Sequence, residues 1–339
     1  MEQLENRAPA GRDIGADFLR ALACFFVVLL HCSGSGSTAA IFINSLTRFS
    51  VPVFVIISGR FCLASDRTVG HYLKKCLRLL LTFVLWSALY YCLLVLPYEG
   101  FDAAGAARFL VTGPQHFWYI YAAMALYLAA PVLRVFCENA DKKRLEYFLL
   151  LTFIFGSLVK TALDTSHFAL LREIIEEMKA EYMLGFLCLF VFGFYEYRFP
   201  PDRKRRGMLY ALGAAGLAAT FFGTLLLTRR SGAFNDLLFG FFAPNVMLSG
   251  AAVYVFFTQR FRTHRPGERA KKVIALLADC SFGIYLAHVL VLDTAVAPLD
   301  FINGLPAVPA ILLRAVMTFC LTALAVWLLR KIKFMRALT

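Results

Sequence analysis

The most constraining feature of this chain is a series of ten apolar runs, each about as long as a bilayer's hydrocarbon core is thick. A helix crosses that core with about 17 to 25 predominantly apolar residues. The chain has 339 residues, of which 60% are hydrophobic and 17% charged, and its mean hydropathy is +0.68. These values exceed the apolar share of a soluble domain. The sequence therefore predicts an all-α polytopic membrane bundle of about ten spans, at residues 14–32, 39–63, 77–97, 117–136, 145–163, 183–199, 208–228, 234–258, 273–297 and 307–329.

The distribution of Lys and Arg predicts the orientation of these helices. Short cytoplasmic loops carry an excess of Lys and Arg. Of the 35 such residues, 26 lie on the side of the two termini, in connections or at the adjoining ends of spans, six lie on the opposite side, and three (Arg20, Arg48 and Arg314) lie within or beside spans. We therefore expect both termini to be cytoplasmic.

Several classes of protein are disfavoured by what the sequence contains. The net charge of +13 is spread over six segments without interleaved aromatic residues, so it indicates membrane topology and not nucleic-acid binding. The nine cysteines form no C-x-x-C pair and most lie in expected spans, which predicts neither a metal site nor a disulfide framework. No phosphate-binding glycine loop is present. Residues 1–339 are expected to form one membrane domain, with an amphipathic helix on the outer surface at about 164–182.

A polar pair in the first apolar run points to chemistry inside the membrane. Arg20 and His31 are separated by ten residues that are all small, thiol-bearing or apolar. Eleven helical steps of about 100° return His31 to within about 20° of Arg20 on the helix surface, about 16 Å further along its axis. Ionisable side chains at membrane depth are costly, by about 2.5 to 3.5 kcal/mol each on insertion scales, and mark functional sites. We expect the two residues to lie at different depths of one cavity wall.

Three further segments combine polar, aromatic and glycine residues near the ends of apolar runs. The first extends from Arg48 to Arg60 and contains Pro52 and the pair Ser58-Gly59, which indicates an irregular helix where it lines a cavity. The other two are His116-Phe-Trp-Tyr-Ile-Tyr121 and Ser281-Phe-Gly-Ile-Tyr-Leu-Ala-His288.

These segments together resemble the bacterial acyltransferase-3 family of integral-membrane O-acyltransferases. The arginine, ten residues, histidine spacing from Arg20 to His31 is the hallmark of that family. The resemblance also rests on the Arg48 to Gly59 segment, on His116-Phe-Trp118 with Pro131 closing the same helix, and on Ser281 to His288. It extends over nearly the whole chain. The closest likeness is to members that acetylate surface polysaccharides such as enterobacterial common antigen.

The resemblance implies transfer of an acyl group, usually acetyl from cytoplasmic acetyl-CoA, to a hydroxyl of a cell-envelope glycan or lipid-linked sugar at the inner membrane. His31 would stand at the position of the essential histidine, and a neutral imidazole suits a general base. Arg20 would bind a CoA phosphate or pair with Asp17, its neighbour on the same face. Arg48 and Ser58 would orient substrate or donate to the developing oxyanion. Acetyl-CoA would be a substrate, with no permanently bound cofactor and no metal.

Each of these assignments has a structural alternative. His31 would then be a buried histidine with satisfied partners, and Arg20 would extend to the cytoplasmic headgroups. Trp118 either binds substrate or belongs to an interfacial aromatic belt. Tyr285 and His288 either form a second cavity wall or pack in the core, and His116 is expected to face interfacial water.

Two positions depart from the pattern of the family. Arg60 follows Ser58-Gly59, where relatives usually carry an aromatic or aliphatic residue, and Val55 stands where a phenylalanine is common. Both bear on the pocket for the acyl chain.

A second functional hypothesis is a small-solute transporter, because a buried Arg and His on a ten-helix bundle also suit a substrate pathway. Transporters favour broken helices at matching positions of two repeats, and residues 1–170 and 171–339 show no such symmetry. A third is a scaffold without catalytic activity. The sequence leaves open the acceptor, the choice between acetyl and another acyl group, direct transfer or an acyl-enzyme, and whether homo-oligomers form.

Overall fold

The structure is a computed structural model that describes residues 11–34, 36–164 and 180–339. It is 84% helical, and no strand occurs among the described residues. Eight helical segments of the described chain are long and apolar enough to cross a membrane: Ile14–Ser33, Thr38–Leu63, Val69–Glu99, Gln115–Asn139, Arg203–Ser231, Leu237–Thr263, Glu268–Val296 and Ala307–Leu329. This confirms the predicted all-α, multi-pass architecture. The amphipathic helix predicted at about 164–182 falls on residues of which 165–179 lie outside the described part.

All ten expected spans contain helical structure. The two that are not among these eight segments, at 145–163 and 183–199, also form helices. The long helices are α2 (Ile14–Ser33), α3 (Thr38–Thr47), α4 (Ser50–Leu63), α5 (Val69–Tyr90), α8 (Trp118–Asn139), α9 (Lys142–Phe153), α12 (Ala180–Arg198), α13 (Arg203–Ala218), α15 (Pro244–Thr263), α16 (Glu268–Val291) and α18 (Ala307–Leu329). Short helices lie between or beyond them: α6 (Leu96–Glu99), α7 (Ala103–Thr112), α10 (Val159–Asp164), α14 (Thr224–Ser231), α17 (Asp300–Asn303) and α19 (Met335–Leu338). In the described part of the chain, π-helical turns extend or join helices at η1 (Tyr91–Val95), η3 (Ile154–Leu158), η4 (Ala219–Gly223) and η6 (Leu292–Val296).

The second expected span is broken one turn before its proline, and its glycine lies at a close helix contact. It consists of α3 and α4, which meet at Arg48 and Phe49. Pro52 has no N–H with which to bond the Arg48 carbonyl four residues earlier, so the helical ladder is interrupted there. The helix then continues without a break across Gly59. The proline therefore accounts for the irregularity, whereas the glycine serves helix packing.

Two other boundaries differ from the expectation. The span expected at 234–258 begins its α-helix only at Pro244, after a 3₁₀ turn η5 (Leu237–Phe239), because proline is favoured at the first position of a helix. Pro131 does not close its helix, since α8 continues through it to Asn139.

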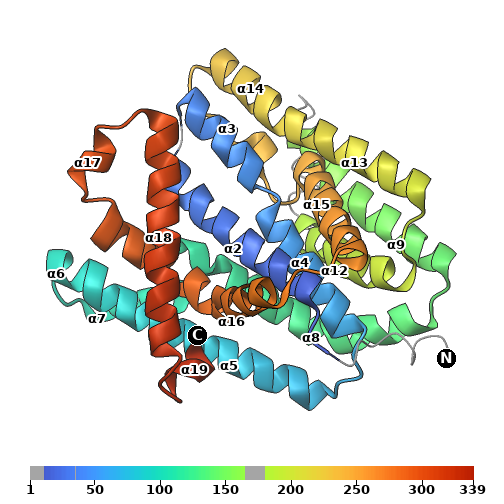
Figure 1. The fold of residues 1–339 in the computed structure, drawn as a ribbon, viewed down its shortest axis with the longest axis horizontal. Coiled ribbons are helices and arrows are strands. Elements are labelled where there is room, and N and C mark those ends of the chain that lie inside the picture. The colour runs from blue at the N-terminus through green and yellow to red at the C-terminus, as the bar shows by residue number, and fades with distance from the viewer. Residues whose placement is uncertain (1–10, 35, 165–179) are drawn as a thin grey trace.

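The first two apolar runs form the centre of the bundle. In Figure 1, α2 and α4 lie in the middle, with α18 and α16 on one side and α12 and α15 on the other. Of the most apolar window in Thr38–Leu63, 72% is buried inside the protein, compared with 22% in Gln115–Asn139. Apolar side chains exposed on the outer helices are those expected to face lipid.

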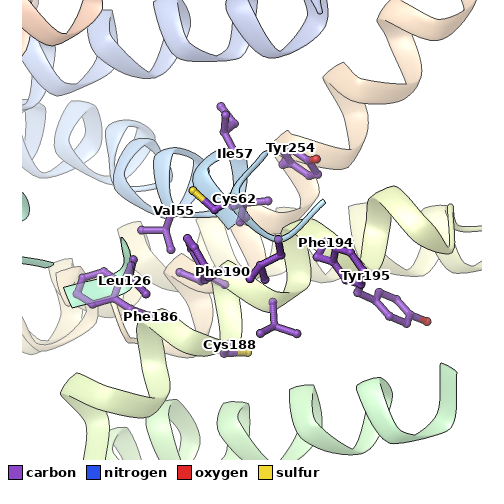
Figure 2. Packing of buried hydrophobic residues seen from close by; sticks show 14 of the residues in the cluster. Val55, Ile57, Cys62, Leu126, Phe186, Cys188, Phe190, Phe194, Tyr195 and Tyr254 are labelled. Atoms are coloured by element: carbon purple, nitrogen blue, oxygen red, sulfur yellow. The ribbon is translucent and has the colours of Figure 1, made fainter. Parts of the chain in front are cut away.

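The crossing of α4 and α12 is the tightest helix contact in this centre. A Cβ added to Gly59 would lie 1.8 Å from the carbonyl oxygen of Phe190, and one added to Gly193 would lie 2.0 Å from that of Ile56. Each helix thus gives the other a glycine at the point of closest approach, the packing that small residues permit in membranes. Figure 2 shows the apolar side chains around this crossing, among them Val55, Phe190 and Phe194.

We predict that Gly193→Ala destabilises the protein, because the added methyl group must displace the backbone of α4. Overpacking of this kind costs about 1 to 3 kcal/mol or more. The measurement is thermal unfolding of the purified protein in one detergent. Gly207→Ala is the matched control, since a Cβ at Gly207 of α13 meets nothing within 4 Å, and alanine is favoured over glycine in a helix by about 1 kcal/mol. Equal midpoints for the two variants would contradict the prediction.

Candidate active site

A cavity of about 380 Å³ lies between α2, α4, α5, α8 and α16. Its volume falls within the range of about 300 to 1,000 Å³ that is usual for small-molecule sites. The walls are mostly apolar or aromatic, with a few polar side chains. The charged, polar and aromatic residues of the lining include Arg20, His31, Phe54, Ser58, Lys75, Arg78, His116, Trp118, Tyr119, Tyr127, Phe241, Phe282 and Tyr285.

Arg20 and His31 both line this cavity, as their spacing on one helix predicts. Arg20 lies one turn after Asp17, whose Oδ1 is 3.5 Å from its guanidinium Nη1. Asp17 is buried and does not line the cavity. Its other oxygen accepts a hydrogen bond from Arg12 Nε. Asp17 is therefore placed to orient Arg20, and a direct role in substrate binding stays a prediction.

Arg12 joins the start of α2 to α16. Its Nη2 donates to Asp279 Oδ1 at 2.7 Å and to the Ala275 carbonyl at 2.8 Å, in addition to the bond from Nε to Asp17. Hydrogen bonds to Asp279 and Asp17 raise the already high pKa of Arg12, so it stays charged. This clamp fixes the helix that carries Arg20 and His31.

Positive charge gathers at the end of the cavity nearest the first residues of α2 and α5. Arg20, Lys75 and Arg78 line this end. The ammonium of Lys75 lies 5.1 Å from the ring centre of Tyr127, a cation–π contact. The sequence placed Lys75 in the connection before the span expected at 77–97 and Arg78 at the start of that span, but α5 begins at Val69 and carries both in the cavity wall. Such a cluster suits the binding of phosphate groups.

Three histidines meet at the opposite end. The ring centre of His31 lies 4.9 Å from that of His288 and 5.9 Å from that of His116, and the latter two are 5.1 Å apart. His31 is exposed to the cavity, whereas His288 is 0% and His116 6% exposed. The expectation that His116 faces interfacial water is therefore wrong, because the packing of α5 and α16 covers it.

Backbone and tyrosine groups hold the two buried histidines. His288 Nδ1 lies 2.8 Å from the Tyr285 carbonyl oxygen, and the Tyr285 hydroxyl donates to the His116 carbonyl at 2.5 Å. Tyr90 of α5 donates to the Leu286 carbonyl at 2.9 Å, and its ring lies against His116 with 5.6 Å between centres. These contacts fix α16 against the start of α8.

Aromatic rings make up much of the wall between the two ends. Trp118 stacks on Phe241 with ring centres 5.3 Å apart, and it is 38% exposed. Tyr285 lies beside Tyr119 at 6.1 Å between ring centres. Trp118 and Tyr285 thus line the cavity, whereas the prediction that they bind substrate stays open.

Ser58 and Arg48 occupy different parts of the site. Ser58 lines the cavity and is hydrogen-bonded to Tyr119, on which Arg20 also acts electrostatically. Arg48 lies outside the lining but interacts electrostatically with His31. Its Nε donates to Asn44 Oδ1 at 2.7 Å, and its guanidinium lies 5.5 Å from the Phe241 ring centre. Arg48 therefore belongs to the histidine end and Ser58 to the cationic end.

The unusual Arg60 has a structural partner outside the cavity. It is ion-paired with Asp13, which caps the start of α2, and its guanidinium lies 5.3 Å from the Tyr197 ring centre. Phe61 lies between Arg60 and Arg20, at 5.3 and 5.1 Å from its ring centre. Arg60 therefore joins α4 to α2 and α12, and it does not line the cavity.

The structure brings together five of the eight predicted site residues in the lining, namely Arg20, His31, Ser58, Trp118 and Tyr285. The other three contact or act on lining residues. In the described part of the chain, no group of three or more His, Cys, Asp or Glu is arranged to hold a metal ion. The sequence did not single out Phe241, because the span expected at 234–258 placed it inside a continuous helix. Gly240 and Pro244 nevertheless signal a break there.

Comparison with protein families assigns the chain. A family model described as "Acyltransferase domain" matches residues 13–330. The chain therefore belongs to the acyltransferase-3 family and is a multi-pass membrane acyltransferase. Comparisons with curated proteins and with solved structures gave no significant match. Family membership favours the acyltransferase hypothesis over the transporter and the scaffold.

We predict that the cavity is open to small polar reagents. A cysteine introduced by Ser58→Cys should react with a water-soluble methanethiosulfonate, because this side chain lines the cavity. The measurement is mass spectrometry of the intact protein, with the nine native cysteines as the baseline. Ile57→Cys is the matched control, since Ile57 is 2% exposed in the α4–α12 core. Labelling of both variants at the same rate would contradict the assigned cavity.

Proposed function

We propose that this acyltransferase moves an acetyl group from cytoplasmic acetyl-CoA to a hydroxyl of a cell-envelope glycan or lipid-linked sugar. The observation that carries the proposal is the polarity of the cavity, which has cations at one end and imidazoles at the other. Acetyl-CoA has the matching shape, with phosphates at one end of a long uncharged arm and the thioester at the other. The location that follows is a bacterial inner membrane.

At the cationic end, Arg20, Lys75 and Arg78 would bind the phosphates of the donor. Hydrogen bonds between guanidinium groups and phosphates are among the strongest in proteins. Asp17 supports this arrangement by holding Arg20 in place. Ser58 and Tyr119, which are hydrogen-bonded to each other beside Phe54, would position the arm.

At the histidine end, the neutral imidazole of His31 would take the proton from the acceptor hydroxyl. The hydroxyl oxygen then attacks the thioester carbonyl, the C–S bond breaks, and the thiolate of CoA takes the proton from His31. Arg48 supplies positive charge near His31, where negative charge develops on the carbonyl oxygen. This route is direct transfer, which predicts no acyl-enzyme and no ping-pong kinetics.

The acceptor would approach from the outer side, past Trp118 and Phe241. The stacked rings at 5.3 Å present an exposed aromatic face, and a flat aromatic surface with few charges suits a sugar ring whose C–H face is apolar. His288 would contact the acceptor only through His31, because it is fully buried.

The test of the proposal is acyl transfer by the purified protein in nanodiscs, with radiolabelled acetyl-CoA and a cell-envelope fraction of glycans and lipids. We expect wild type to form a hydroxylamine-sensitive ester and His31→Ala to lose about 10² to 10⁴-fold of the rate, as expected for a general base. His264→Gln is the control, because this histidine is exposed on the loop between α15 and α16. If wild type binds acetyl-CoA but labels no envelope component, the assigned acceptor is wrong; absence of binding would refute the donor.

A second prediction concerns the phosphates of the donor. Replacement of both Lys75 and Arg78 by alanine should raise the KM for acetyl-CoA by about tenfold or more, since charge-assisted hydrogen bonds are lost. It should leave the KM for S-acetylpantetheine, which lacks the phosphates, nearly unchanged. Replacement of both Arg269 and Lys272 by alanine, which removes two exposed cations outside the cavity, is the control for net charge. Equal effects on both donors would place the phosphates elsewhere.

A further inference from the structure

Two buried ring nitrogens at the histidine end lack hydrogen-bond partners. Nε2 of His288 and Nε2 of His116 are both buried, and neither has a hydrogen-bond partner. A buried polar atom without a partner is costly, so each such atom calls for an explanation. Both imidazoles belong to the wall around His31, and one of them is fully buried.

Backbone contacts determine which nitrogen of each ring carries the proton. His288 Nδ1 lies 2.8 Å from the Tyr285 carbonyl oxygen and 3.2 Å from that of Ile284, and a carbonyl can only accept, so Nδ1 must be the donor. The His116 ring interacts with the backbone of Leu286, while its Nε2 remains unpartnered. In neutral His288, Nε2 is therefore a lone-pair acceptor.

The third histidine, His31, lies beside both of these rings. Two imidazoles joined by an N–H···N hydrogen bond have ring centres about 5 Å apart, given an N···N distance of about 2.9 Å. The centres of His31 and His288 are 4.9 Å apart, with the ring planes inclined by 56°. The spacing of the two rings therefore matches that of a hydrogen-bonded pair. Catalytic hydrogen bonds of this kind often tighten only when substrate binds.

In the described part of the chain, no carboxylate forms an ion pair with His31. A histidine that acts as a general base usually has an orienting group on its second nitrogen, most often a carboxylate. We propose that His288 takes this role, accepting a hydrogen bond from one nitrogen of His31 so that the other faces the cavity as the base. His116 supports the pair from the α8 side. The inference rests on the proposed acyl transfer and adds His288 as its positioning residue.

Proton transfer through His31 requires only a neutral hydrogen-bond acceptor, such as the imidazole of His288, on its second nitrogen. When His31 takes the hydroxyl proton it becomes an imidazolium, and the lone pair of His288 stabilises its remaining N–H by a charge-assisted hydrogen bond. When the proton leaves for the thiolate of CoA, His31 is neutral again and no net charge stays buried. A buried carboxylate in place of His288 would carry a permanent negative charge that costs desolvation.

Two substitutions of His288 separate the positioning role from a structural one. The amide oxygen of glutamine can occupy the place of Nε2 and accept from His31, whereas asparagine can only replace Nδ1 and its bond to the backbone. We expect His288→Gln to keep most of the kcat and His288→Asn to lose about 10- to 100-fold, with little change in the KM for acetyl-CoA in either. A purely structural role predicts the reverse order, because asparagine preserves the contact with the Tyr285 carbonyl.

The second measurement does not depend on transfer. In protein labelled with ¹⁵N-histidine, six side chains give signals, and His31→Gln identifies those of residue 31. We expect one neutral tautomer at His31 in wild type and in His288→Gln, and a mixture of tautomers in His288→Asn. A mixture in wild type, or equal kcat in the two variants, overturns the positioning role. If wild type transfers no label but shows one tautomer that His288→Asn disturbs, only the proposed function fails.

Discussion

The structure depends on the requirement that polar groups inside a membrane find partners within the protein. A charged side chain at the centre of a bilayer costs several kcal/mol, and lipid offers it no hydrogen bond. The first helix therefore lies at the centre of the bundle, where Asp17 pairs with Arg20 and the rings of His116 and His288 lie beside His31. Neighbouring helices must approach this helix and its partner α4 closely, and the reciprocal glycines at the α4–α12 crossing permit that approach.

This arrangement separates two electrostatic environments by a distance that one helix sets. Eleven residues of α2 span about 16 Å, so phosphates held at Arg20 and a thioester at His31 fit a single extended donor. The walls between are aromatic, and they exclude the charges that would compete for either end. A membrane enzyme that takes its donor from one side and its acceptor from the other needs such a passage. The cavity between α2, α4, α5, α8 and α16 has the polarity that such a passage would require.

Local periodicity accounts for what could be predicted from the sequence. The spacing of Arg20 and His31 on one helix depends only on the geometry of the α-helix, and both line the cavity. His116 was misplaced because its burial depends on Tyr90 and Tyr285, which come from helices far away in sequence. Lys75 was assigned to a loop because an excess of cations marks cytoplasmic connections, and the same cations serve equally well at the mouth of a cavity. Contacts between helices, unlike positions on one helix, leave no periodic signal.

The cluster of three imidazoles also bears on how such a site avoids trapping a proton. A carboxylate beside His31 would favour the imidazolium, and a base that stays protonated cannot accept the hydroxyl proton. A neutral imidazole such as His288, whose Nδ1 donates to a backbone carbonyl, offers a lone pair and no formal charge. Such a ring orients the base while the low dielectric around it disfavours a resting charge. The backbone of α16, which also carries Tyr285 of the cavity wall, is thus as much a part of the site as the side chain of His31.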